Sequence, residues 1–169
     1  SAATTLQQSI IIGDNAVGSG VATGANNVII GDNAGLVLTS GANNVAVGAS
    51  ALDANTTASN NTAVGYAALG ANTEGIGGTA VGFGALITNT DGDYNTGIGY
   101  YALAVNTTGT QNNALGQQSL AANTTGGQNA AIGTFALTAN TTASYNTAVG
   151  HNSMSANTTG NYHTALGYN

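Results

Sequence analysis

The sequence of 169 residues contains no lysine, no arginine and no cysteine, and only 4% of its residues are charged. Average globular proteins have about 25% charged residues. Because proteins hold phosphate groups and anionic lipid headgroups with lysine and arginine, this chain is not expected to bind nucleic acid or an anionic membrane surface. The absence of cysteine excludes disulfides and thiolate sites. No apolar run reaches the roughly 18 residues of a transmembrane helix, so membrane insertion is not expected either.

The main feature of the sequence is a repeat. A glycine that follows two small or aliphatic residues recurs once after 18 residues and then every 17 residues. A fixed period of this kind indicates a repeat protein. The consensus of one copy is NTAVGYxALxANTTGxY. The repeating glycines are Gly13, Gly31, Gly48, Gly65, Gly82, Gly99, Gly116, Gly133, Gly150 and Gly167.

Two apolar columns and a turn signal predict the fold of one repeat. An aliphatic residue precedes each repeating glycine, a second large apolar residue follows it after four positions, and an Asn-Thr pair typical of turns follows after seven. Helix pairs repeat at about 34 to 47 residues, whereas 17 residues suffice for two short strands and two turns. We therefore expect an all-β fold, a parallel β-solenoid of about ten 17-residue coils. Residues 1–169 would form a single domain, uncapped at both ends.

The alternation of side chains along a strand predicts an interface. We expect the aliphatic column to face the coil interior, so the column before it faces outward. That column is small or apolar in every coil, and a strand that is apolar on both faces is usually buried on both. The alternative is a solvent-exposed column of small residues. The residues predicted to contact other chains are Ile11, Ile29, Ala46, Ala63, Ala80, Ala114, Ala131, Ala148 and Ala165.

Segments 43–52 (NNVAVGASAL) and 61–69 (NTAVGYAAL) resemble the head repeats of trimeric autotransporter adhesins and the repeats of phage tail-fibre-like and bacterial surface proteins. The resemblance covers residues 9–169. It implies a left-handed parallel β-roll, commonly trimeric, that projects from a cell or virion surface. The coils of the adhesin heads are shorter than 17 residues. The repeated positions of the family are structural, so the resemblance transfers no functional residue.

Few side chains could support catalysis or metal binding. The acid nearest to His151 in the sequence is Asp93, about three coils or on the order of 16 Å away, far beyond a hydrogen bond of about 3 Å. We therefore expect no enzyme, no catalytic residue and no cofactor. Asp91 and Asp93 could offer oxygens to Ca²⁺, but no complete calcium loop is present. No metal site is expected, and the acids are interpreted as solvated turn residues.

Two columns are candidates for ligand binding. Tyr94, Tyr145 and Tyr162 share one column, where their rings could stack on sugars or fill a groove between chains. A threonine column that could order water, as in ice-binding solenoids, lies in a predicted turn rather than on a strand. Its members are Thr56, Thr73, Thr90, Thr107, Thr124, Thr141 and Thr158.

Together these features predict a structural extracellular fibre protein, either a filament subunit or the repeat region of an adhesin or tail fibre. Its role would be surface extension or attachment, at a cell surface, in a secreted filament or in a virion fibre. The expected partners are further copies of the chain, in a homotrimer or an end-to-end filament, and a glycan receptor. The alternative is a glycan- or ice-binding β-solenoid.

Overall fold

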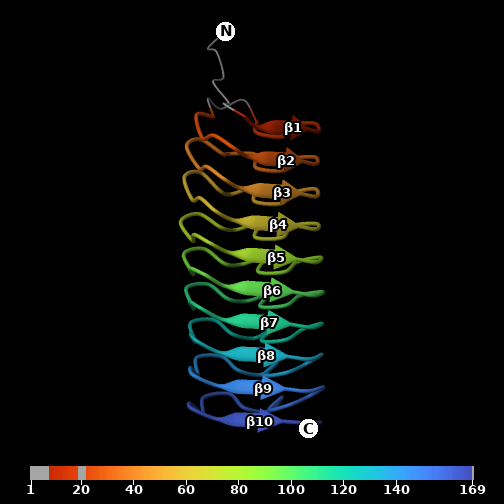
Figure 1. Ribbon diagram of the computed structural model, residues 1–169, viewed down its shortest axis with the longest axis vertical. Helices are drawn as coiled ribbons and strands as arrows, with labels where there is room; N and C mark the ends of the chain where they lie inside the picture. The colour runs from red at the N-terminus through yellow and green to blue at the C-terminus, as the bar shows by residue number, and fades with distance from the viewer. Residues whose placement is uncertain (1–7, 19–21, 169) are drawn as a thin grey trace.

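A computed structural model describes residues 8–18 and 22–168 and confirms the predicted parallel β-solenoid. Residues 1–7, 19–21 and 169 of the predicted domain lie outside the described ranges. The described residues contain one short strand per coil and no helix (Figure 1). The strands are β1 (Ile10–Ile12), β2 (Val28–Ile30), β3 (Val45–Val47), β4 (Thr62–Val64), β5 (Thr79–Val81), β6 (Thr96–Ile98), β7 (Asn113–Leu115), β8 (Ala130–Ile132), β9 (Thr147–Val149) and β10 (Thr164–Leu166).

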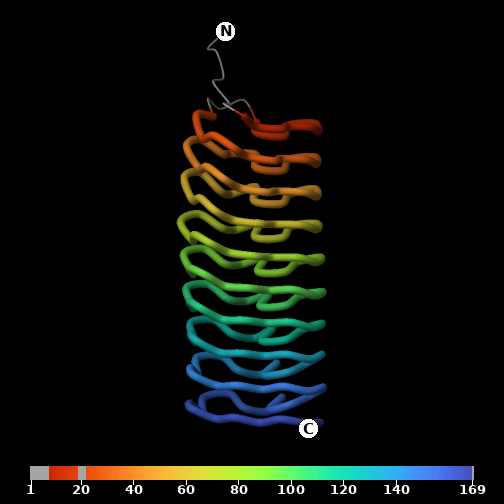
Figure 2. Tube along the Cα trace, in the orientation of Figure 1, coloured from red at the N-terminus to blue at the C-terminus, as the bar shows by residue number. Residues whose placement is uncertain are grey.

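The ten strands form a single parallel sheet in chain order, in which each strand pairs with the strands of the coils before and after it. The register follows the repeat, so Ala63 pairs with Ala80 and Val64 with Val81. The coils stack as a nearly straight column (Figure 2). Equivalent residues of successive coils lie above one another at the strand spacing of about 4.8 Å. Each side chain therefore lies next to the equivalent side chains of the neighbouring coils.

The orientation predicted for the strands is wrong, because the middle residue of each strand points into the coil and the residue before the glycine points outward. Nearly all the middle residues are fully buried, while Ile11 and Ala165, in β1 and β10, are partly buried. The column predicted as an interface is therefore part of the core of a single chain. These residues are Ile11, Ile29, Ala46, Ala63, Ala80, Ala114, Ala131, Ala148 and Ala165.

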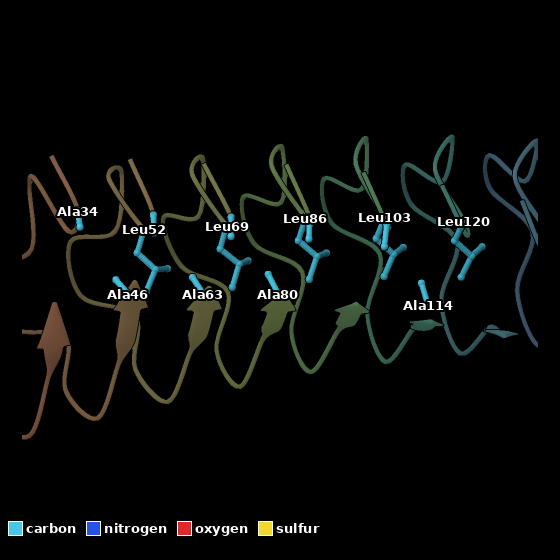
Figure 3. Packing of buried hydrophobic residues seen from close by; sticks show 14 of the residues in the cluster. Ala34, Ala46, Leu52, Ala63, Leu69, Ala80, Leu86, Leu103, Ala114 and Leu120 are labelled. Atoms are coloured by element: carbon cyan, nitrogen blue, oxygen red, sulfur yellow. The ribbon is translucent and has the colours of Figure 1, made fainter. Parts of the chain in front are cut away.

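The thinness of the coil explains this orientation. The second apolar column, which follows the strand, fills the interior of the middle coils with one leucine each (Figure 3). Only a small residue fits between that leucine and the sheet, so the middle strand residue is usually alanine. The coil of β2 reverses the arrangement: Ile29 occupies the strand position and Gly35 replaces the leucine, and a Cβ on Gly35 would lie 3.4 Å from the Ile29 side chain. Ile29 and Gly35 thus exchange volume between these two positions, and the same coil also buries Leu38.

This complementarity predicts strong coupling between Ala80 and Leu86, which occupy the two interior positions of the coil of β5. Ala80→Ile alone should overpack the coil and destabilise it by about 1–3 kcal/mol. Leu86→Gly alone should leave a cavity and cost more than about 3 kcal/mol. The double variant should recover at least about 1 kcal/mol relative to the sum of the single changes. Denaturant unfolding of the three variants measures this coupling, and strict additivity would contradict the shared-volume account.

The leucine column adopts an unusual backbone conformation. Leu69, Leu86 and Leu103 have φ between 50° and 53°, in the left-handed region, and are fully buried. A left-handed backbone costs an L-residue about 1–2 kcal/mol. Burial of a leucine side chain returns about 1.5–3 kcal/mol, so the burial offsets the strain. This conformation turns the chain sharply enough to close a 17-residue coil.

Two ladders of buried asparagines satisfy the backbone inside the turns. In the ladder before the strands, the side-chain oxygen of Asn112 accepts from the backbone N–H of Asn129, one coil later, at 3.1 Å. This ladder comprises Asn27, Asn44, Asn61, Asn95, Asn112, Asn129 and Asn146. In the ladder after the leucines, the amide group of Asn123 donates to the side-chain oxygen of Asn106 at 2.8 Å and to the carbonyl of Gly126 at 2.9 Å. It comprises Asn55, Asn72, Asn89, Asn106, Asn123, Asn140 and Asn157.

Candidate functional surface

The predicted tyrosine column is exposed, but its three members are not brought together. The rings of Tyr145 and Tyr162 stack with centroids 4.8 Å apart and an angle of 4° between their planes. Tyr94 lies three coils away and covers Gly77, where a Cβ would approach the tyrosine ring to 2.7 Å. The ring faces that a sugar would contact are thus partly occupied by neighbouring coils, while the ring edges point to solvent.

A second group of aromatic residues lies directly after the repeating glycines. Phe83 stacks between Tyr66 and Tyr100, with ring centroids 5.0 and 5.6 Å away, and Tyr101 packs against Tyr100 edge to face. The sequence placed Tyr66, Phe83 and Tyr100 in one column, but this group was not predicted as a site. Its rings also turn their faces toward one another, so they resemble a structural stack more than an open platform.

The threonine column in the turn is engaged in hydrogen bonds between coils. The hydroxyl of Thr107 donates to the carbonyl of Thr124 at 3.1 Å, and that of Thr124 donates to the carbonyl of Thr141 at 3.0 Å. A hydroxyl that donates within the protein has no proton left for ordered water. The column therefore acts as a third ladder that joins successive coils.

The residues that point outward from the strands form an uncharged surface with one continuous aliphatic column, which sequence reasoning assigned to the interior. We call the first and third residues of the ten strands the outer sheet face. The third residue is aliphatic in every strand, and several of these side chains are well exposed, from 43% for Ile132 to 76% for Leu166. None of the strand residues is charged. The outer sheet face therefore carries an exposed aliphatic column along the whole sheet.

The turn acids have structural contacts of their own. A carboxylate oxygen of Asp93 accepts from the backbone N–H of Ile76 at 2.8 Å, and Asp91 accepts from the hydroxyl of Thr73 at 3.2 Å. In the described ranges no three His, Asp or Glu side chains lie close enough together to hold a metal ion. His151 packs between Phe135 and Tyr168. The acids and histidines are thus dispersed among the coils.

Asp53 is the one acid with a clearly shifted titration. Burial raises the pKa of its carboxyl above 3.8, against hydrogen bonds from the backbone of Asp53 and Ala54, which lower it. Because the folded state then holds the proton more tightly than the unfolded state, this group makes the protein less stable as the pH rises from below about 4 toward neutrality.

Asp53→Asn should remove that contribution while it keeps an oxygen to accept the backbone hydrogen bonds. We expect the unfolding free energies of the wild type and the variant to be closest at acid pH, and the variant to be the more stable at neutral pH. Denaturant unfolding across a pH series measures the difference. A wild type that gains stability relative to the variant with rising pH would contradict the assignment.

The described residues contain no helix that is long and apolar enough to cross a membrane. No family model, no curated protein and no solved structure matches the chain.

Proposed function

We propose that the chain is the rod-like part of an extracellular fibre, either a filament subunit or the repeat region of an adhesin or tail fibre. The observation that carries the proposal is the uninterrupted stacking of equivalent coils, each bonded to the coils on either side. Such a solenoid gains length with every coil that is added. The ten strands span about 48 Å at the usual strand spacing. The resemblance of the repeat to adhesin and tail-fibre repeats points in the same direction.

The internal hydrogen bonding suits a protein that must persist outside a cell. Backbone groups are paired between coils along the solenoid, and the buried asparagines pair many of the groups in the turns. The chain also contains no lysine or arginine, so trypsin has no cleavage site. These properties favour a passive structural element that spaces or displays other groups.

Immunogold electron microscopy on the cells or particles that carry the natural protein tests the proposal. Antibodies raised against the exposed turns should label surface projections without permeabilisation. A variant that lacks residues 66–82, one complete coil, should still fold and should give a rod shorter by about 4.8 Å in small-angle scattering. Label confined to the cell interior would contradict the proposal.

The two binding alternatives have less support. Stacking on sugars needs free ring faces, and Tyr145 and Tyr162 each have one of their two faces covered by the other ring. Ordering of water by the turn threonines needs free hydroxyl protons, which are donated to carbonyl groups instead. We expect no binding on a glycan array and no thermal hysteresis. A glycan signal that Tyr145→Ala abolishes would favour the first alternative, and hysteresis would favour the second.

A further inference from the structure

We propose that the outer sheet face binds a second copy of the same chain, in a two-fold pair whose solenoid axes run antiparallel. The inference names a partner for the proposed fibre and in that sense rests on the proposed function. It replaces the interface predicted from the sequence, whose residues lie in the core. The polarity of the face, its size, its spacing and the residues along its margin favour this pairing.

The polarity of the face suits a protein contact that is not built on charge. Its third column is aliphatic from Ile12 to Leu166, and its first column consists of aliphatic residues, threonine and one asparagine. The chain has no cation anywhere, so nothing on the face recruits an acidic partner. Two copies can bring these faces together without burying a charged strand residue.

The size of the face matches a modest but specific interface. Ten strands at about 4.8 Å give a length of about 48 Å, and the strand residues with the residue after the glycine give a width of about 13 Å. The area is therefore about 600 Å² per copy, or about 1,200 Å² in total. A specific protein contact buries at least about 1,000 to 1,200 Å².

The spacing of the face favours a second copy over an unrelated partner. The coils repeat along a nearly straight column (Figure 2), and the in-register strands place equivalent residues of the face once per coil. A partner with the same spacing can pack every side chain of this face between two of the partner's side chains along the whole length of the face. Two sheets that pack in this way lie about 10 Å apart.

The residues along the margin of the face select the antiparallel arrangement. The residue after each repeating glycine forms a corner column that begins with Asp14 and Asp32 and ends with His151 and Tyr168. In a two-fold pair with antiparallel axes the corner columns of the copies run along the same margin. With parallel axes they lie on opposite margins.

When β1 of one copy faces β10 of the other, the coil of β2 faces the coil of β9. This register places Asp32 opposite His151 and Asp14 opposite Tyr168, and all four side chains are exposed in the single chain. The carboxylate of Asp32 can then accept a hydrogen bond from the imidazole N–H of His151 of the other copy. The two-fold axis makes each such contact twice. No other histidine or cationic residue lies in the corner column.

Thiol cross-linking tests the pairing directly, because the chain has no native cysteine. The variant that carries both D32C and H151C should form a covalent dimer with a bismaleimide cross-linker that spans the roughly 10 Å between packed sheets. D32C and H151C alone should give no dimer in this register. Sedimentation of the wild type over a concentration series should approach twice the 16.3 kDa of one chain.

A charge in the middle of the face should break the pair. Val81→Lys should shift the wild-type dimer to monomer at the same concentration, because the lysine would be buried against Ile98 of the other copy. Thr57→Lys, in an exposed turn, is the matched control and should leave the dimer intact, and circular dichroism should show both variants folded. A wild type that stays monomeric or forms trimers would overturn the inference, and so would a D32C/H151C variant that does not cross-link. A rod-shaped monomer would do so and leave the proposed function standing.

Discussion

Gly99→Ala should destabilise the solenoid by more than about 3 kcal/mol. The glycine before each turn has a φ between 122° and 141°, a conformation that costs another residue about 1–3 kcal/mol. A Cβ at Gly99 would also lie 2.5 Å from the carbonyl oxygen of Gly116 in the next coil. The Gly116 carbonyl oxygen already accepts hydrogen bonds from Ser119. Because this oxygen is held in place, the two coils would have to separate locally to admit the Cβ. Denaturant unfolding measures the loss.

Gly167→Ala is the matched control for this prediction. Gly167 has a similar φ of 122°, but a Cβ there would meet no atom within 4 Å among the described residues. The control therefore carries the backbone strain without the collision and should cost about 1–2 kcal/mol. Equal losses in the two variants would show that close stacking of coils is not what requires glycine at this position.

Asn112→Ala should cost about 3 kcal/mol or more. The Asn112 side chain is fully buried, donates to the carbonyl of Gly126 at 2.8 Å and accepts from the backbone and side chain of Asn129 at 3.1 and 3.0 Å. Alanine would leave the backbone N–H of Asn129 without its acceptor in a coil too thin for water. A buried group left unpaired costs about 1–3 kcal/mol, and the other lost bonds add about 1 kcal/mol each.

Asn113→Ala provides the comparison, since Asn113 is the next residue and its side chain is exposed. This change should alter the unfolding free energy by less than about 0.5 kcal/mol. Unfolding of both variants under the same conditions separates the role of the ladder from that of asparagine in general. A similar small effect for Asn112→Ala would contradict a structural role for the ladder.

The repeat predicted the parallel solenoid and the number of coils, and it identified the leucine column as a second apolar column. Stacking makes each position a column, so a pattern that is ambiguous in one coil becomes clear over ten. The turn asparagines were also predicted, because asparagine followed by threonine is a turn signal. The asparagine ladder before the strands was not predicted, although the consensus contains this asparagine directly before Thr-Ala-Val. An asparagine beside a strand gives no local sign that its side chain is buried.

The direction of the strand side chains could not be predicted from hydrophobicity, because both faces of the strands are apolar. We assigned the larger strand residues to the interior because of their size, but the leucine that follows the strand leaves room for only a small residue at the middle strand position. The sequence does contain a usable signal: the coil with Ile29 at the middle of its strand has Gly35 where most coils have leucine. That exchange of volume between two positions identifies them as neighbours in the core.

The positive φ of the leucines could not be predicted either. Leucine seldom adopts this conformation, and the strain is accepted only because the whole coil closes around the side chain. Local conformational preferences therefore predict the turn positions of the glycines and asparagines, but they do not predict the positive φ of the leucines. The outer sheet face was missed for the related reason that its residues were assigned to the core.

Spin-label distances along one column test the stacking of coils most directly. Single nitroxides attached through T57C, T142C and T159C would lie in equivalent exposed turns, and the chain has no other cysteine to label. Pulsed electron paramagnetic resonance on doubly labelled, magnetically diluted protein should give about 24 Å between positions 57 and 142, five coils apart, and about 29 Å between positions 57 and 159, six coils apart. Distances that do not increase by about 4.8 Å per coil would contradict the solenoid and every conclusion built on it.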